Sequence, residues 1–370
     1  MGLVFVVENF LSLRNIAIQF NRLNVLIGPN ASGKSNIIKA LDFVSRFVRE
    51  GVDAINHLFR RRDFEDITFL GRGGDVKFEL RFNNTRYVLR MRLGSLEEEV
   101  YSNGKRIFSR VSTPDGEQIS YLTSNDSWET ISLRQEQTIV GKISIPLSHV
   151  VKLGICTDLK NAIRFLSSIN TYSFDPEVMR SRSHIRTPPR LERRGGNLAR
   201  VVLHYYLENR TRFNELESVF KMLIPDVEEI VPVLREDYVW VAFREKYSDM
   251  LIDPEFLSDG SLRILALLVS LFDENSVVAY EEPENFIHPH LLESIVDIIK
   301  KYGKIVIITT HSPYLLDYVE PGDVILVTKV NGETKLRRLV DTDEINVVKK
   351  YLEEGGTLGE AWFSGLMGEV

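Results

Sequence analysis

A glycine-rich octapeptide near the N-terminus constrains this chain more than any other feature. Residues 28–35 read GPNASGKS and fit the pattern G-x-x-x-x-G-K-[ST]. The apolar stretch Leu23–Ile27 precedes it, and a helical pattern that carries Leu41, Val44 and Phe47 follows it. A strand, a glycine-rich turn and a helix in this order predict a loop whose backbone N–H groups converge on phosphate oxygens at a helix N-terminus.

The side chains at the end of this loop predict the ligand, ATP with Mg²⁺. Lys34 is expected to reach the β- and γ-phosphates, and the Ser35 hydroxyl is expected to bind Mg²⁺. The loop residues that we expect to contact the nucleotide are Asn30, Ala31, Ser32, Gly33, Lys34, Ser35 and Asn36.

A second candidate feature is an apolar strand, Val277–Tyr280, that runs into carboxylates. Acidic residues at the carboxyl end of a strand can place a metal ligand and a base beside phosphates. We interpret Glu281 as the Mg²⁺ ligand, and Glu282 as the base that accepts a proton from the attacking water. Acidic residues also commonly end strands and cap helices, so this pattern by itself leaves a structural role open.

Two further segments carry polar residues where helices are predicted to begin. Ser258 and Gly260 open one helix, where they could form an anion site, although by local physics a plain N-cap is favoured. His311 follows the predicted strand Ile305–Thr310, with Ser312 and Pro313 at the start of the next helix. An imidazole at a strand end can contact a phosphate or a water, although a lone histidine is more often structural.

Composition limits the classes of protein. The chain has 370 residues with 44% hydrophobic and 26% charged residues, which is typical of a globular protein rather than a disordered one. No run of about 18 apolar residues occurs, so we expect no membrane partner. The single cysteine, Cys156, cannot form an intramolecular disulfide, which favours the cytoplasm.

Basic residues gather in two places although the net charge is −6. One is Arg60–Arg62, and the other is the segment from Arg180 to Arg194, with six arginines and one glutamate. Such a segment is either a solvated, mobile loop or a contact for a phosphate backbone, and the sequence leaves both open.

The pattern of elements predicts an α/β fold with an insertion. We expect the first part of a nucleotide-binding lobe at 1–75, a β-rich subdomain at 76–155 and a helical lobe at 156–235. The lobe is expected to resume at 236–330, and a hairpin and a helix to follow at 331–370. Turn signals at Asn83-Asn84 and Asn103-Gly104 predict hairpins in the β-rich part.

The order of these motifs resembles the ABC-type ATPase heads of the RecF, SMC and OLD group, which are P-loop NTPases. The matching pieces, over most of the chain, are Glu8-Asn9-Phe10, GPNASGKSN from Gly28, LSDGSLR from Leu257, EEPENFIHP from Glu281 and TTHSP from Thr309. Glu281 stands where the group more often has Asp, and Ala31 where Gly is frequent. Gln135 and Gln137 are candidates, by region only, for the usual glutamine loop.

The resemblance implies an ATPase that dimerises on ATP. Two heads would sandwich two ATP molecules, so that Ser258 and Gly260 of one head contact the γ-phosphate bound by the other. His311 would act as the switch histidine that senses that phosphate. No sustained heptad pattern occurs, and the stretch after Ser312 lacks clustered carboxylates in the number that a nuclease needs. We therefore expect neither a coiled coil nor a C-terminal nuclease domain in this chain.

Three uses of the ATP cycle follow from this resemblance. The first is DNA repair or DNA handling, with the arginine segment as the contact. The second is a nucleotide-controlled module that gates a separate toxin or nuclease effector in defence. The third, the ATPase of a transporter, fits poorly because transporter signatures are usually LSGGQ.

Overall fold

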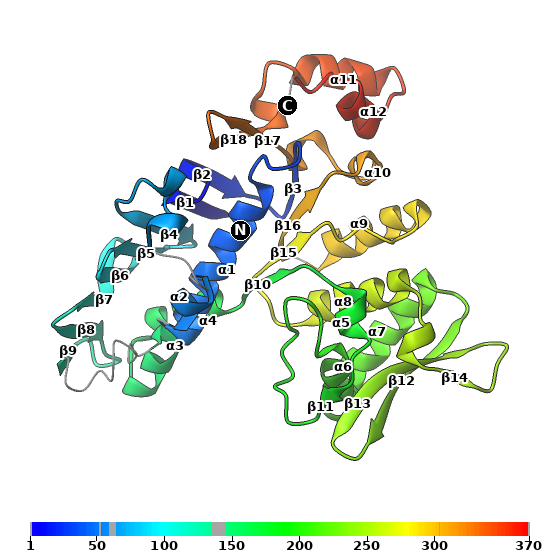
Figure 1. Ribbon diagram of the computed structural model, residues 1–370, viewed down its shortest axis with the longest axis horizontal. Coiled ribbons are helices and arrows are strands. Elements are labelled where there is room, and N and C mark those ends of the chain that lie inside the picture. The colour runs from blue at the N-terminus through cyan, green and yellow to red at the C-terminus, as the bar shows by residue number, and fades with distance from the viewer. Residues whose placement is uncertain (1, 52, 59–63, 135–145, 303, 369–370) are drawn as a thin grey trace. The chain divides into compact units, whose positions relative to one another are not determined.

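The computed structural model describes residues 2–51, 53–58, 64–134, 146–302 and 304–368. The chain forms two compact units (Figure 1). Unit 1 comprises Met1–Asn170 and Ile325–Thr342, and unit 2 comprises Thr171–Val324 and Asp343–Glu369. Each unit is built from segments that lie far apart in the sequence.

Unit 1 contains an eight-stranded antiparallel sheet in the order β2-β1-β4-β5-β6-β7-β8-β9. Its strands are β1 (Leu3–Phe10), β2 (Leu13–Phe20), β4 (Val76–Phe82), β5 (Thr85–Arg92), β6 (Ser95–Ser102), β7 (Lys105–Thr113), β8 (Gly116–Leu122) and β9 (Trp128–Arg134). The predicted turns occur at two hairpins, where Asn83 and Asn103 adopt the left-handed backbone (φ 49° each) that asparagine tolerates.

One helix covers part of this sheet and places the phosphate loop. Helix α1 (Lys34–Glu50) buries Phe43 against Phe78 of β4, with ring centroids 5.3 Å apart. The helix ends at Glu50, and Gly51 follows with φ 62°, a conformation that glycine adopts without strain. The other helices of unit 1 are α2 (Asp53–Leu58), α3 (Leu147–Val150) and α4 (Thr157–Ser167).

A buried charged cluster lies within the same sheet. Arg110 on β7 is fully buried and directly opposite Glu98 on β6, and its Nε lies 3.4 Å from both Glu98 and Glu117. The Tyr87 hydroxyl donates to Glu98 at 2.7 Å. Burial raises the pKa of Glu98, although Arg110 opposes that shift. The sheet therefore holds paired ionisable groups inside an otherwise largely apolar core.

Three more strands of unit 1 frame the glycine-rich loop. β3 (Leu23–Ile27) is buried along its whole length and neighbours β17 (Val324–Val330), which pairs antiparallel with β18 (Glu333–Arg338). The loop follows β3 directly and α1 begins at its last lysine. The strand, turn and helix predicted from the sequence are all present.

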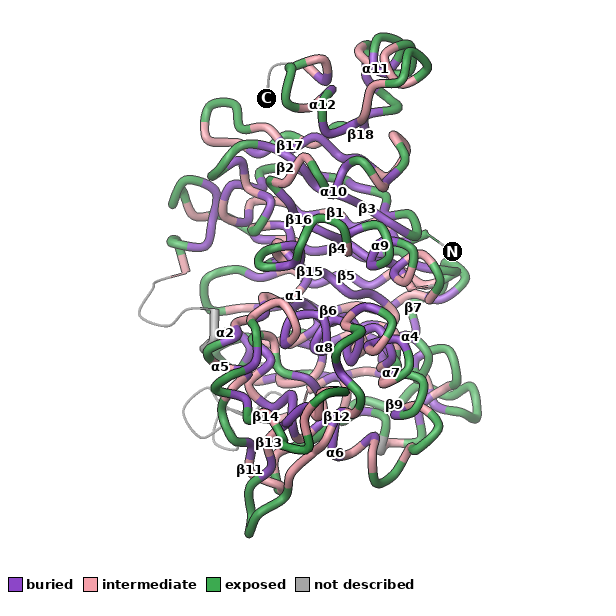
Figure 2. Tube along the Cα trace, turned by 90° about the vertical axis from the view of Figure 1, so that its right-hand side faces the viewer, coloured by how far each residue is buried: buried purple, intermediate pink, exposed green. Residues whose placement is uncertain are grey.

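Unit 2 is mixed α/β. β15 (Val277–Glu281) and β16 (Ile305–Thr310) are parallel neighbours, with β10 (Ile169–Tyr172) beside β15, and β16 is buried throughout (Figure 2). A smaller sheet contains β11 (Ser183–His184), β12 (Val227–Arg235), β13 (Tyr238–Glu245) and β14 (Leu251–Ile252). The helices are α5 (Pro176–Met179), α6 (Leu198–Glu208), α7 (Arg210–Leu223), α8 (Asp259–Phe272), α9 (Leu292–Lys301), α10 (Pro313–Leu316), α11 (Ile345–Glu353) and α12 (Leu358–Phe363).

Helix α8 forms the centre of unit 2. From Leu262 to Phe272 every residue is buried, and the helix packs against α5, α6 and α7. A helix that is apolar all round needs neighbours on every side. Its N-terminus at Ser258, by contrast, is exposed. No helix in the described ranges has the length and hydropathy that a membrane span requires.

Candidate functional site

The phosphate loop of unit 1 has two glycines that no other residue could replace without a shift. A β-carbon on Gly28 would lie 2.0 Å from the Val327 carbonyl oxygen, and one on Gly33 would lie 1.9 Å from Thr334 Oγ1. Gly33 also has φ 108°, outside the range of most L-residues. The strands β17 and β18 therefore press on the loop and fix its shape.

The backbone of Ala31 is strained, although its side chain is small. Its backbone has φ 61°, which costs a non-glycine residue about 1 kcal/mol. By size alone, Ala31 differs from the frequent Gly only by a methyl group. The difference between the two residues here lies instead in the backbone conformation.

The charged and hydroxyl groups of the loop fit a phosphate ligand. Lys34 is buried, and its Nζ donates to the carbonyl oxygens of Gly28 and Pro29 at 2.7 and 3.0 Å. Ser32 is also buried, and within the described part of the chain its hydroxyl has no hydrogen-bond partner. A buried ammonium and an unsatisfied hydroxyl in one turn match the acceptor oxygens of a phosphate.

A chain of hydrogen bonds braces the loop from distant parts of unit 1. Asn36 Nδ2 donates to Ser12 Oγ at 2.8 Å, and Ser12 Oγ lies 2.7 Å from Thr334 Oγ1. Thr334 in turn donates to the Ser32 carbonyl oxygen at 2.9 Å. Sequence reasoning missed Ser12 and Thr334, because nothing local marks two hydroxyls that lie 322 residues apart.

Mg²⁺ takes few protein ligands and keeps several waters, so a small donor set is enough. Ser35 is exposed at the start of α1, and Asn30 is exposed in the turn. Among the described residues no group of three or more His, Cys, Asp or Glu could hold a metal by itself. The residues present fit a Mg²⁺ ion that is carried mainly by phosphate and water.

The predicted acidic residues lie at the end of β15 in unit 2. Glu281 accepts a hydrogen bond from Arg193 at 2.5 Å. Glu282 has φ 46°, and its N–H donates to the Thr309 carbonyl oxygen at 2.9 Å. This left-handed residue turns the chain away from the strand and leaves its carboxylate partly exposed, at 39%.

Glu282 and His311 lie close together within unit 2. His311 Nε2 is 3.5 Å from Glu282 Oε1, and Asn285 Nδ2 donates to Glu282 Oε2 at 2.8 Å. A carboxylate held from both sides has a defined direction, which a general base needs. Asn285 was not predicted, although it directly follows the acidic run.

The helix N-cap predicted at Ser258 is present. Ser258 Oγ accepts from the Ser261 N–H at 3.1 Å, and Gly260 packs on the backbone of Phe286. Arg180 donates to the Leu257 carbonyl oxygen at 2.8 Å and to Asp259 at 2.5 Å. The start of α8 is therefore attached to both the acidic turn and the arginine segment.

The arginine segment is ordered by contacts inside unit 2. Arg180 pairs with Asp259, Arg193 with Glu281, and Arg194 with Asp175. Arg182 lies over the Trp240 ring at 4.7 Å, and Arg186 is exposed. Three of the six arginines thus form ion pairs within unit 2, and one of these ion pairs is with Glu281. Arg60–Arg62, Gln135 and Gln137 lie outside the described residues.

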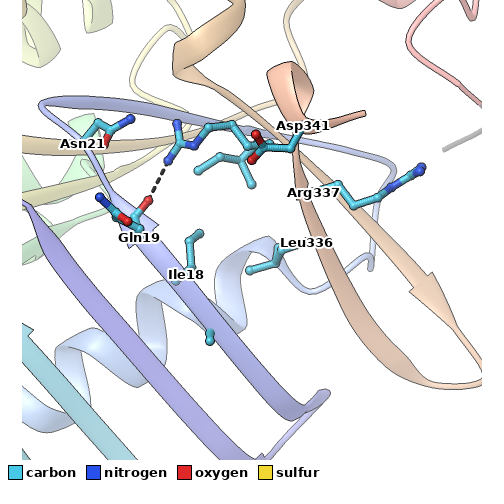
Figure 3. Close-up of a pocket in the computed structure, with 9 residues that line it drawn as sticks. Ile18, Gln19, Asn21, Leu336, Arg337 and Asp341 are labelled. Carbon is cyan, nitrogen blue, oxygen red and sulfur yellow. Dashed lines mark hydrogen bonds between the residues drawn. The ribbon is translucent and has the colours of Figure 1, made fainter. Parts of the chain in front are cut away.

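A pocket of about 490 Å³ lies elsewhere in unit 1, between β2 and β18 (Figure 3). Gln19, Leu336 and Asp341 line it, and Arg338 donates to the Gln19 carbonyl oxygen at 2.6 Å beside it. None of the predicted site residues lines this pocket. The candidate residues are the phosphate loop within unit 1 and, separately, the acidic and histidine turns within unit 2.

Comparison with known proteins gives the family. Two solved structures share the fold. One is the "SmcHead bound to the C-winged helix domain of ScpA", with TM-score 0.56 and 15% identity, covering 90% of this chain and 96% of that chain. The other is the "Smc head domain with an extended coiled coil bound to the C-terminal domain of ScpA derived from Pyrococcus furiosus", with TM-score 0.51 and 15% identity, covering 96% and 99%.

These structures confirm the predicted fold class, an α/β P-loop NTPase of the SMC-type ATPase head. No curated protein matches the sequence. A family model described as "AAA domain, putative AbiEii toxin, Type IV TA system" matches residues 23–139 and 162–317. Since these ranges span well over half of the chain, the protein belongs to this AAA-domain family, and its own fold is that of the SMC head structures.

Proposed function

We propose that the protein hydrolyses ATP with Mg²⁺. The observation that carries this proposal is the Glu282 carboxylate held between His311 and Asn285 at the end of β15, in a chain that also has a braced phosphate loop. The backbone N–H groups of the loop and Lys34 would hold the phosphates. Ser35 and Glu281 would hold Mg²⁺, which when bound offsets charge on the phosphate oxygens.

In the hydrolytic step, Glu282 would accept a proton from the water that attacks the γ-phosphate. His311 would contact the γ-phosphate and keep Glu282 in position. In this structure Arg193 donates a hydrogen bond to the Glu281 carboxylate. The arginine would have to release this carboxylate when the cation binds.

We further propose that ATP brings two copies together. Ser258 is exposed at the N-terminus of α8, where N–H groups and the helix dipole favour a phosphate of a second head. The burial of α8 favours such a role, because a helix N-terminus that binds a phosphate across an interface must keep its orientation. Hydrolysis would then separate the heads.

The effect of the cycle is proposed to be control of a protein effector rather than DNA handling. The family description names a toxin of a type IV toxin–antitoxin system, which favours a nucleotide-controlled module in the cytoplasm. The ion pairs of Arg180, Arg193 and Arg194 reduce the positive charge that the arginine segment could offer to DNA. DNA handling remains the second candidate, supported by exposed Arg186 and by Arg182.

Steady-state ATP turnover tests the hydrolytic proposal. Glu282→Gln should lower kcat by about 100-fold or more while ATP still binds, since a general base contributes about that much. Lys34→Ala should lose ATP binding. The surface variants Glu293→Gln and Lys39→Ala are matched controls that should behave like the wild type. Normal turnover by Glu282→Gln would refute the assignment of the base.

The choice between DNA and a protein effector needs two further measurements. Light scattering of Glu282→Gln in ATP should give the mass of a dimer. Turnover should be indifferent to DNA, and the double variant Arg182→Gln/Arg186→Gln should not change this. Salt-sensitive stimulation by DNA that this double variant abolishes would favour the DNA-handling function instead.

A further inference from the structure

Two turns leave the same edge of the unit 2 sheet side by side. β15 and β16 are parallel, and Glu281 is paired with Thr309 in their register. The residues that follow, from Glu282 on one strand and from Thr310 on the other, therefore emerge next to each other. The base and the histidine of the proposed reaction are on these two turns.

The Glu282 turn has a backbone conformation that needs support. A left-handed backbone is strained for a non-glycine residue and persists only where its surroundings fix it. Here the Glu282 N–H donates to Thr309, and the Ile287 N–H donates to the Glu284 carbonyl oxygen at 3.0 Å. The acidic turn is therefore tied to β16 and also closed on itself.

A buried carboxyl group joins the second turn to the first. Glu284 is 8% exposed, and Thr310, which is fully buried, donates its hydroxyl to Glu284 Oε1. The same hydroxyl accepts the Ser312 N–H at 2.8 Å. The residues on both sides of His311 are thus held by one hydroxyl, and that hydroxyl is held by Glu284.

We propose that Glu284 is a positioning residue, which through the Thr310 hydroxyl fixes the backbone of His311 and so keeps the imidazole against Glu282. This inference rests on the proposed ATPase function and adds to it a residue that the sequence motifs did not assign. Glu284 lies only two residues from Glu282, so the acidic turn carries both the base and the anchor of its partner.

The cost of burying Glu284 supports a role beyond folding. Burial raises the pKa of Glu284 to about 7, although the Thr310 hydrogen bond opposes that shift. A buried polar group that serves stability alone is often replaced by an apolar side chain without loss. What an apolar side chain could not supply here is an acceptor for the Thr310 hydroxyl.

The test removes one hydroxyl and then restores it. Thr310→Val keeps the shape and the strand propensity, and it should lower kcat by about 10- to 100-fold with KM for ATP unchanged, because misplacement of a catalytic group costs that much. Thr310→Ser keeps a hydroxyl and should recover most of kcat. Thr309→Val is the matched control, since that buried hydroxyl makes only a 3.5 Å contact with the Tyr280 carbonyl oxygen.

A second readout does not depend on turnover. The imidazole ¹⁵N resonances of His311 should shift in Thr310→Val and stay at the wild-type positions in Thr310→Ser and Thr309→Val. If Thr310→Val does not fold, Thr310→Ala takes its place with the same expected results. Wild-type kcat and unchanged His311 resonances in the hydroxyl-free variant would overturn the inference.

The proposed ATPase function and the positioning role of Glu284 can be refuted independently of each other. If Glu282→Gln retains turnover, the base assignment is wrong whatever Thr310→Val does. If Glu282→Gln is inactive and Thr310→Val is fully active, only the positioning role of Glu284 is wrong.

Discussion

Gly260 at the start of α8 lies against the backbone of Phe286 in the acidic turn, and a β-carbon built on the glycine would be 2.6 Å from the Phe286 carbonyl oxygen. Phe286 itself has φ 67°. The start of the LSDG helix and the turn that carries Glu282 are therefore in direct contact within one unit. A shift in one of them has to be accommodated by the other.

Gly260→Ala should displace the acidic turn. The added methyl group meets backbone rather than a flexible side chain, so we expect a loss of about 1–3 kcal/mol in the free energy of unfolding together with a lower kcat. Gly322→Ala is the control, because a β-carbon there meets nothing within 4 Å. Denaturant unfolding and turnover that match this control would contradict the expectation.

Gly33→Ala should abolish ATP binding. It combines a left-handed backbone with a β-carbon 1.9 Å from Thr334 Oγ1, and we expect a destabilisation of about 3 kcal/mol or more. Gly104→Ala separates the two effects, since Gly104 has φ 78° with open space around it and should cost only the backbone strain, roughly 1 kcal/mol. Calorimetric titration with ATP checks the prediction, which fails if Gly33→Ala binds ATP like Gly104→Ala.

Arg193→Gln should strengthen the binding of Mg²⁺. The guanidinium lies 2.5 Å from Glu281, where it competes with a second cation for the carboxylate. Removing a repulsion of about 1 kcal/mol would lower the Mg²⁺ concentration for half-maximal binding of a fluorescent ATP analogue by roughly fivefold. Arg186→Gln, an exposed change in the same segment, should leave that concentration unaltered. If Arg193→Gln needs a higher Mg²⁺ concentration for half-maximal binding than the wild type, this role is contradicted.

Glu284→Gln should change how stability depends on pH. Burial raises the pKa of Glu284 to about 7, above its ordinary value of 4.5, so the folded state favours the protonated form. The stability that this proton supports is present at low pH and is lost as the pH rises from about 4.5 through about 7, up to about 3 kcal/mol. Glutamine does not titrate. In urea unfolding, the free energy of unfolding of the variant should therefore rise relative to that of the wild type between about pH 5 and about pH 8. A constant difference between the two proteins over that range would show that Glu284 does not titrate there.

Local signals in the sequence predicted the parts of the site that depend on local structure. The β3 strand, the loop and α1 follow from apolar periodicity and glycine spacing, and the Ser258 cap follows from the side chain that starts the helix. The hairpin turns at Asn83 and Asn103 follow from the backbone preference of asparagine. These features need only a few neighbouring residues.

Contacts between distant segments were not predictable in the same way. Thr334 braces Ser32 across 302 residues, and Arg193 reaches Glu281 across 88. Hydroxyls and guanidinium groups occur throughout such a chain, so no spacing rule marks the one that will become a partner. The arginine segment illustrates this limit, because its charges suggest an external ligand until their internal partners are seen.

The charged cluster in the sheet of unit 1 acts against misfolding of that sheet. Tyr87, Glu98, Arg110 and Glu117 come from the four consecutive strands β5–β8. If β7 slipped by two residues, its apolar side chains would still face inward, so hydrophobic alternation does not exclude that pairing. Such a slip would, however, separate Arg110 from Glu98 and leave carboxylates buried without a cation. Of these two registers, only the native one places Arg110 where Glu98 and Glu117 can share its charge.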